Sequence, residues 1–194
     1  MKKLFAIAGS PRRGGNSEIL LDEAIRAARD AGLEVDKLVV AELDISPCNS
    51  CGGCWETGEC VIEDEMQGVY KKLLEADYVV VASPLYFLGI SAQLKALIDR
   101  CQALWARRFI LKKPLRDGHR QPRGLFISTA ALGKAEDIVF AGSGQTVRAL
   151  FSTIEIEYAG GLFFKGLEVR DAVKSHPEFL EETYRATREL IAGK

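Results

Sequence analysis

Short apolar runs of strand length alternate with longer amphipathic segments along the chain. The apolar runs fall at residues 4–8, 35–40, 77–82, 124–128 and 155–163, and the amphipathic segments at 17–31, 64–75, 91–104, 144–153 and 177–192. In segment 17–31 the apolar residues recur at the spacing of one helical face, with charged residues outside it. The run DYVVVA at 77–82 is typical of a parallel strand covered on both faces. The pattern therefore predicts strands and helices in regular alternation.

This alternation, with no repeat and no low-complexity linker, predicts an α/β fold with helices on both faces of a parallel sheet. Five strands favour a flavodoxin-like three-layer sandwich of strand order 2-1-3-4-5 over a six-stranded dinucleotide-binding domain. One domain spanning 1–194, with a cysteine-rich loop at 48–60, is expected. The switch point of this order lies between the first and third strands. A ligand is therefore expected over the loops that follow Ala8 and Ala82.

Composition narrows the classes of partner. Hydrophobic residues make up 47% and charged residues 27%, which is ordinary for a folded globular protein. A net charge of −1 argues against a nucleic-acid partner, and no apolar run has the length of a membrane helix. The short N-terminal apolar run is expected to be a buried strand rather than a signal peptide. We therefore expect a cytoplasmic protein without nucleic-acid or membrane partners, whose thiols stay reduced.

The loop GSPRRGGNS, residues 9–17, joins the first predicted strand to the first helix. It brings hydroxyl groups, an amide, two arginines and free backbone N–H groups to a helix N-terminus, which is a ready anion site. It matches neither the dinucleotide GxGxxG fingerprint nor a Walker A loop. The alternative is a capped strand–helix turn with Asn16 or Ser17 as N-cap and the arginines in water.

This loop resembles the FMN-phosphate loop of the NAD(P)H-dependent FMN reductase branch of flavodoxin-like proteins, in which a G-S-P-R-x-x-G-N-S/T pattern holds a monophosphate. The resemblance implies FMN as cofactor and NAD(P)H as a possible electron donor. Carried onto this chain, it implies phosphate contacts from Ser10, Arg12, Asn16 and Ser17, with Pro11 shaping the turn.

A second loop begins SPLYFLG at residue 83, directly after the third predicted strand. Proline ends that strand, and the residues after it offer flat apolar surface that suits either a flavin ring or the core beneath a loop. The segment resembles the flavin-edge segment of the same family, S-P-x-Y-F followed by a helix with L-K-x-x-I-D-R. The resemblance implies ring contacts from Pro84, Leu85, Tyr86 and Phe87.

A third loop, residues 129–133, follows the fourth predicted strand. The fold would bring it to the far side of the ring, and its small residues would permit stacking of a partner or substrate. We expect Thr129 and Gly133 to contact the cofactor there.

The segment CNSCGGCWETGEC, residues 48–60, holds four of the five cysteines of the chain. The spacing C-x2-C-x2-C-x5-C fits a structural zinc site poorly, since zinc usually takes two separated pairs. A redox dithiol would leave two cysteines unexplained, and a disulfide is disfavoured in a reducing compartment. A 4Fe–4S cluster fits better, because C-x2-C-x2-C is the tight wrap of bacterial ferredoxins.

This compact motif on a flavodoxin-like chain resembles the iron–sulfur flavoproteins of methane-producing archaea. The resemblance implies a 4Fe–4S cluster held by Cys48, Cys51, Cys54 and Cys60. Related flavin reductases keep several such cysteines without a cluster, so cluster-free thiols and zinc stay open as alternatives. Cys101, alone on the predicted third helix, is expected to be a small buried hydrophobe without a role.

The predicted function is FMN-dependent electron transfer between the cluster and a small acceptor such as oxygen, a peroxide or a quinone-like molecule. The resemblance implies a ferredoxin-like electron donor and a homodimer or homotetramer. One alternative is a cluster-free NAD(P)H-dependent FMN or quinone reductase; another is an FMN-binding redox sensor that acts through its thiols. His119 and His176 are expected at the solvated surface, as is the basic stretch 107–123, which could otherwise dock an acidic electron carrier.

Overall fold

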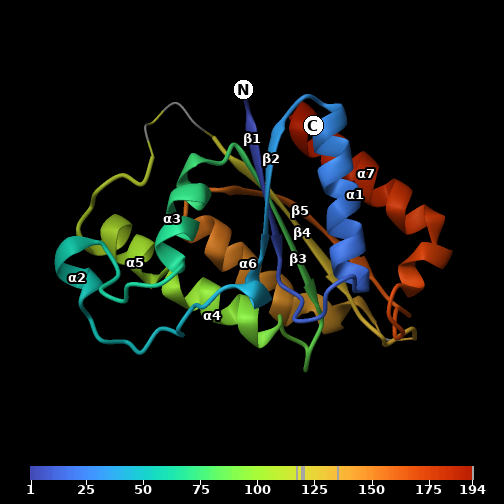
Figure 1. Cartoon of the computed structure of the whole chain (residues 1–194), viewed down its shortest axis with the longest axis horizontal. Coiled ribbons are helices and arrows are strands. Elements are labelled where there is room, and N and C mark those ends of the chain that lie inside the picture. The colour runs from blue at the N-terminus through green and yellow to red at the C-terminus, as the bar shows by residue number, and fades with distance from the viewer. Residues whose placement is uncertain (117, 119–120, 135, 194) are drawn as a thin grey trace.

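A computed structural model of the chain describes residues 1–116, 118, 121–134 and 136–193. Five parallel strands form its sheet, in the order β2-β1-β3-β4-β5 (Figure 1). Their bounds are β1 Lys3–Ala8, β2 Glu34–Val39, β3 Tyr78–Pro84, β4 Arg123–Thr129 and β5 Glu157–Phe164. The predicted flavodoxin-like strand order and the three-layer arrangement are confirmed.

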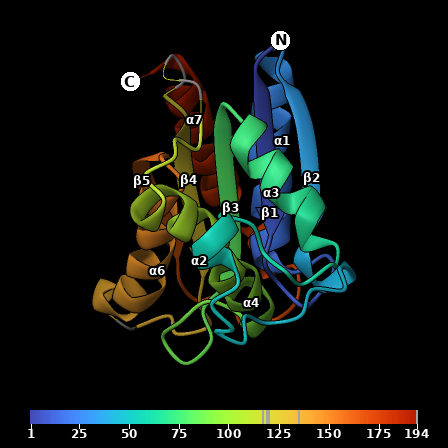
Figure 2. The ribbon, with the colours of Figure 1, turned by 90° about the vertical axis from the view of Figure 1, so that its left-hand side faces the viewer.

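Helices cover both faces of the sheet, as Figures 1 and 2 show. The helices α1 (Asn16–Asp30) and α7 (Pro177–Ala192) lie together on one face. The opposite face carries α3 (Met66–Glu75), α4 (Ala92–Arg100) and α6 (Ala141–Thr153), with the short α2 (Cys54–Thr57) and α5 (Gln102–Trp105) beside them. Single turns of 3-10 helix at Val40–Glu42, Asp137–Phe140 and Ala172–Ser175, and a π-helical turn at Ala106–Ile110, complete the helical segments. None of the helices in the described ranges is long and apolar enough to cross a bilayer.

The alternation of side chains along each strand builds two cores, one on each face of the sheet. Phe5 and Ile7 of β1 point into the core beneath α3, α4 and α6. Leu4 and Ala6 point into the core beneath α1 and α7. β3 is buried from Tyr78 to Ser83 because it is a central strand with helices on both sides, which explains its continuous apolar sequence.

Several predicted boundaries shift by one to three residues, and three differences bear on the sites. The segment 91–104 is two helices, because α4 ends at Arg100 and α5 begins at Gln102. The second long helix begins at Met66 rather than at residue 64, since the Asp64 carboxylate lies before the helix and accepts the Met66 N–H at 3.0 Å. β3 runs through Pro84, which pairs with Thr129 at the last position of both strands. Thr129 therefore ends β4 and does not belong to the loop after it.

Two glycines offer a test of how tightly the core beneath α3, α4 and α6 is packed. In Gly124→Ala, on β4, the new Cβ would lie 2.3 Å from the Phe151 ring. Because β4 is paired on both sides, the strand cannot move away, and we expect unfolding free energy to fall by about 1–3 kcal/mol. In Gly68→Ala, on the exposed face of α3, the new Cβ meets nothing within 4 Å, and we expect a gain of about 0.5–1 kcal/mol. Urea unfolding of both variants measures the difference; equal midpoints would contradict the packing described.

Candidate functional site

One hollow lies where β1, β3 and β4 end. Its lining comes from four segments of the chain: the loop after β1 with the start of α1, the loop after β3, the end of β4, and the loop after β5. The lining residues are Ser10, Arg12, Gly15, Asn16, Ser17, Pro84, Leu85, Tyr86, Thr129, Ala131, Leu167 and Glu168. The structure thus brings three of the predicted loops together at the switch point of the sheet.

The loop after β1 presents hydrogen-bond donors to this hollow. The buried Ser10 hydroxyl accepts the Arg12 N–H at 3.0 Å and donates to the Arg12 carbonyl at 3.1 Å, which closes a tight turn. α1 starts after an extended Gly15 without a side-chain cap, so the alternative with Asn16 or Ser17 as N-cap is wrong. The first N–H groups of a helix have no carbonyl partner within it and carry the positive end of its dipole. An anion in the hollow would meet these groups.

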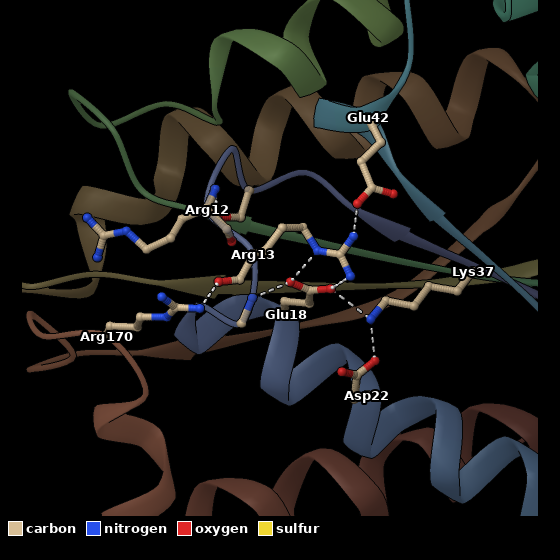
Figure 3. Close-up of polar contacts among 9 residues, drawn as sticks. Arg12, Arg13, Glu18, Asp22, Lys37, Glu42 and Arg170 are labelled. Carbon is tan, nitrogen blue, oxygen red and sulfur yellow. Dashed lines mark hydrogen bonds and ion pairs between the residues drawn. The ribbon is translucent and has the colours of Figure 1, made fainter.

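The two neighbouring arginines of the loop differ in their partners. Arg13 is held by two carboxylates: it pairs with Glu18 at 3.0 Å and contacts Glu42 (Figure 3). The Arg12 side chain points away from this network and has no hydrogen-bond or ion-pair partner among the described residues (Figure 3). Arg12 is therefore the cation of this loop that is free to meet a ligand.

Glu18 organises the loop from beneath. Its side chain is only 4% exposed and accepts the Gly14 N–H at 2.7 Å and the Lys37 ammonium at 2.9 Å (Figure 3). Burial raises the pKa of Glu18, but the bonds from Lys37 and Gly14 and the charge of Arg13 outweigh it, so the pKa lies below its ordinary value. The carboxylate stays ionised, and Lys37 and Arg13 neutralise it beneath the loop after β1.

Asn16 ties the loop to the segment that follows β5. Its side-chain amide donates to the carbonyls of Leu167 at 3.2 Å and Val169 at 2.9 Å and accepts the Val173 N–H at 3.0 Å. The amide is therefore committed to the protein, and Asn16 can offer a phosphate its backbone N–H. Arg170 adds a second tie by donating to the Arg13 carbonyl at 2.8 Å (Figure 3).

The loop after β3 forms a tight turn. Tyr86 and Gly89 exchange both backbone hydrogen bonds at 2.9 Å, so Phe87 and Leu88 form the tip. Both tip residues have positive φ, 48° and 63°, a conformation that costs non-glycine residues about 1–3 kcal/mol each. The tip is exposed, and the Phe87 side chain is fully so. This strained apolar turn stands at the rim of the hollow, which Tyr86 lines.

Backbone and side-chain bonds hold the loops against each other. The Leu85 N–H donates to the Thr129 carbonyl at 2.8 Å, which joins the loop after β3 to β4. The buried Ser91 hydroxyl accepts the Leu94 N–H at 3.2 Å as N-cap of α4 and donates to the Gly9 carbonyl, which joins α4 to the loop after β1. The hollow is therefore framed by loops that cannot move independently.

Eight of the predicted cofactor contacts line the hollow: Ser10, Arg12, Asn16, Ser17, Pro84, Leu85, Tyr86 and Thr129. Three predicted residues do not line it. Pro11 is exposed in the turn between Ser10 and Arg12, Phe87 is at the exposed tip, and Gly133 faces Gly166, whose Cα would lie 3.6 Å from a Cβ at residue 133.

The four clustered cysteines line a second cavity. Cys48, Cys51, Cys54 and Cys60 surround it together with residues of α2 and of the end of α4 and the start of α5. The cysteine segment bends through positive φ at Ser50 (57°), Gly52 (78°) and Gly58 (79°). At Gly58 a Cβ would lie 2.9 Å from the Arg107 side chain, so this bend also needs a residue without a side chain.

The thiols are close enough to affect one another. Burial raises the pKa of Cys54, and the charges of Cys60, Cys48 and Cys51 raise it further. In the described part of the chain, no group of three or more His, Cys, Asp or Glu side chains could hold a single metal ion. What the four thiols share is one cavity, which all of them line. All are free, and Cys101 is buried as predicted.

The basic stretch 107–123 is committed in part to internal contacts. Arg108 donates to the Ser152 carbonyl, and Arg116 donates to the Leu73 carbonyl at 2.8 Å. His119 lies outside the described residues; His176 is half-buried and its ring stacks on Phe179.

Sequence reasoning missed two buried charges at these sites. Glu18 occupies the third helical position after Gly15, where an acidic residue reaches back to a preceding backbone N–H, and this spacing could have found it. Arg100 follows Leu94 and Leu97 at steps of three, so a charged residue continues the apolar stripe of α4. A charge in an apolar stripe signals a buried ion pair.

The fold is flavodoxin-like, with one hollow at the loop after β1 and a second cavity lined by four thiols. The NADPH-dependent FMN reductase family matches residues 2–136. The iron–sulfur flavoprotein of Methanosarcina thermophila is 40% identical over 57% of this chain and 58% of its own length, so the match spans little more than half of that relative. An iron–sulfur flavoprotein of Archaeoglobus fulgidus is 34% identical over 82% of this chain and 68% of its own length. The chain therefore belongs to the NADPH-dependent FMN reductase family, among its iron–sulfur flavoproteins.

The solved structure of an NAD(P)H:quinone oxidoreductase from Methanothermobacter marburgensis has the same fold. It superposes with a TM-score of 0.73 over 97% of this chain and 96% of its own, at 14% sequence identity.

Removal of the Glu18 charge should loosen the loop in a pH-dependent way. In Glu18→Gln the carboxylate that holds Gly14, Arg13 and Lys37 is lost, and we expect unfolding free energy to fall by about 1–3 kcal/mol at neutral pH. Because the folded-state pKa is depressed, this stabilisation is present above the unfolded pKa of about 4.3 and is lost as the pH falls through the folded pKa. Urea unfolding at neutral and acid pH should show the difference shrink in acid.

Asp22→Asn is the matched control. Its carboxylate contacts the same Lys37 ammonium at 2.6 Å but is 53% exposed, so we expect a loss below about 1 kcal/mol. Equal losses in the two variants would contradict the role assigned to Glu18.

Proposed function

We propose that the protein binds FMN in the hollow at the ends of β1, β3 and β4 and acts as a flavin-dependent electron-transfer oxidoreductase. The observation that carries the proposal is the convergence of a free arginine, a helix N-terminus and an apolar loop on one hollow. Membership of the FMN reductase family supports it.

The loop after β1 would bind the phosphate end of the cofactor. Arg12 supplies a cation without an internal partner, and Ser17 supplies a hydroxyl and a backbone N–H at the start of α1. These donors, with the backbone N–H of Asn16, match the charge and hydrogen-bonding needs of a monophosphate. Arg13 would act indirectly, by neutralising Glu18 so that this carboxylate does not repel the anion.

The loop after β3 would hold the ring. Pro84, Leu85 and Tyr86 line the hollow and offer apolar contact to a flat aromatic system. The exposed tip at Phe87 and Leu88 would cover the ring from the rim or meet a second copy of the chain. Thr129, whose carbonyl is already taken by the Leu85 N–H, offers its side chain from the opposite wall.

We further propose that Cys48, Cys51, Cys54 and Cys60 hold a 4Fe–4S cluster. Their shared cavity and the similarity to iron–sulfur flavoproteins support this ligand set. A bound cluster supplies single electrons, whereas a flavin exchanges one or two, so together they would couple a ferredoxin-like donor to two-electron reduction of a small acceptor such as oxygen, a peroxide or a quinone. The four thiols would have to be reduced, as they are in cytoplasm.

The two cavities lie at opposite ends of α4 and share no lining residue. α4 has nine residues, which places its ends roughly 13 Å apart. We propose a homodimer or homotetramer in which the cysteine segment of one copy approaches the flavin of another. Apolar side chains exposed near both cavities, Trp55 beside the cysteines and Phe87 beside the hollow, support such an assembly.

Arg12→Ala should weaken FMN binding without loosening the fold. The loss of one charge-assisted contact to phosphate, worth about 1.5–3 kcal/mol, corresponds to a rise of tenfold or more in the FMN dissociation constant. Stability of the flavin-free protein should stay unchanged, since Arg12 has no internal partner in the described residues. Titration of flavin fluorescence measures the constant. Arg29→Ala, in the last turn of α1, removes the same charge far from the hollow and should leave it unchanged; an unaltered constant in Arg12→Ala would argue against this phosphate site.

Cys54→Ala should abolish metal binding, because a 4Fe–4S cluster takes four cysteine thiolates and the variant leaves only three in the cavity. Anaerobic purification followed by iron, sulfide and FMN quantitation should give about four irons per chain in the unaltered protein and none in the variant. Cys101→Ala, at the buried fifth cysteine, should keep its iron.

A pure flavin spectrum without iron, even after anaerobic reconstitution, would exclude the cluster. The second candidate function, a cluster-free NAD(P)H-dependent FMN or quinone reductase, would then be favoured by the family match, and NAD(P)H would bleach the flavin without a ferredoxin. A thiol-based redox sensor would show neither iron nor turnover, but a cysteine-dependent change in assembly.

A further inference from the structure

Arg100 is a fully buried charge beside the cysteine cavity. Its side chain is 0% exposed, at the last position of α4, and it lines the cavity with the four cysteines. A guanidinium removed from water is costly unless it is paired and hydrogen-bonded. The groups that pair with the guanidinium therefore indicate the role of this charge.

The guanidinium closes both ends of the cysteine segment. Nη1 donates to the Ser46 carbonyl at 2.8 Å, and Nη2 donates to the Ile62 carbonyl at 3.1 Å. These two residues flank the run from Cys48 to Cys60 on either side. One side chain thus holds together the two points at which the cysteine segment leaves and rejoins the rest of the fold.

Asp64 completes this clasp. Its two carboxylate oxygens accept from Nη1 of Arg100 at 2.6 Å and from Nη2 at 3.1 Å, and they also accept the N–H groups of Ser46 and Met66, each at 3.0 Å. Burial raises the pKa of Asp64, but the bond from Arg100 and the two backbone bonds outweigh it and hold the pKa below its ordinary value. Asp64 is therefore the counter-charge of Arg100 as well as the start of α3.

One donor of Arg100 is left over. A guanidinium has five N–H groups, and the four on Nη1 and Nη2 are taken by the clasp. Nε is buried and has no hydrogen-bond partner among the described residues. Unpaired buried donors are rare, and this one belongs to a side chain that lines the cysteine cavity. Cys60, on the same cavity, lies near enough to the guanidinium to raise the pKa of Arg100, by a side-chain contact as well as by its charge.

We propose that Arg100 is the positioning residue of the cysteine site. It holds the two flanks of the cysteine segment together. It also places a buried positive charge and a free N–H beside the group that the four thiolates hold. This inference rests on the proposed cluster. One-electron reduction of that group by a ferredoxin-like donor adds one negative charge without a proton. A fixed cation in a medium of low dielectric constant stabilises the reduced form, so Arg100 raises the reduction potential.

Paired substitutions with opposite expected shifts test the proposal. Arg100→Met removes the cation and should favour the oxidised form at least tenfold, a fall in midpoint of about 59 mV for one electron. Asp64→Asn removes the counter-anion and should shift the midpoint upward. A merely structural role would shift both variants in one direction or neither. Arg100→Lys keeps the positive charge but loses the planar guanidinium that bonds several partners at once. Its midpoint should therefore stay nearer to that of the unaltered protein, while its iron should be released faster to a chelator.

The measurement is an anaerobic potentiometric titration of the FMN-loaded protein, monitored by electron paramagnetic resonance for iron and by absorbance for flavin. Lys95→Met, a half-exposed position on the same helix paired with Asp99, makes the same change in net charge and should move neither midpoint. FMN uptake reports folding; if Arg100→Met does not fold, Asp64→Asn and Arg100→Lys carry the test.

The outcomes separate this inference from the proposed function. Iron in the unaltered protein with midpoints that do not move, or that move together, would overturn the role of Arg100 and leave the cluster standing. FMN binding without iron in the unaltered protein would overturn the cluster and with it the electrostatic role of Arg100.

Discussion

Both sites depend on the pairing of β1 with β3. The two strands run parallel in register from Leu4 opposite Tyr78 to Ala8 opposite Ala82, and the Gly9 N–H continues the ladder by donating to the Ala82 carbonyl at 2.7 Å. The chain then leaves β1 for α1 on one face of the sheet and leaves β3 for α4 on the other (Figure 1). Two loops that diverge from adjacent strand ends open a hollow between them. The same departure fixes the direction of α4, whose far end holds the cysteine cavity.

Each cavity is organised by one buried carboxylate. Glu18 binds a backbone N–H and two cations beneath the loop after β1, and Asp64 binds two backbone N–H groups and Arg100 beside the cysteine segment. In both places the carboxylate orders a loop that has little apolar surface of its own. The two sites differ, however, in where their remaining cation lies. At the hollow an exposed Arg12 is left for a ligand, whereas at the cysteine cavity the cation is entirely inside the protein.

The periodicity of the sequence predicted the strands and their order, because these follow from burial on two faces and from chain handedness. A hollow does lie at the switch point of that order, and its role as a ligand site stays a prediction. The periodicity did not predict what single polar side chains do. Asn16 has the sequence context of a phosphate ligand, yet its amide is used to tie down the segment at 167–173, which is about 150 positions away in the chain. Arg100 continues the apolar stripe of Leu94 and Leu97, a spacing that signals burial but does not name the partner of the charge. Its burial follows from Asp64, which only the tertiary fold brings to it.

The two cavities lie at opposite ends of α4, which constrains how the two sites could work together. At its first turn α4 is fixed by Ser91, which binds Gly9 of the loop after β1. At its last turn it is fixed by Arg100, which binds both flanks of the cysteine segment. A shift of the helix along its axis would therefore disturb both cavities together. Since neither loop can adjust without straining α4, the helix sets a fixed spacing between the two sites within one chain. The apolar tip at Phe87, strained at positive φ and exposed, is the feature of the hollow least explained by the fold of a single chain.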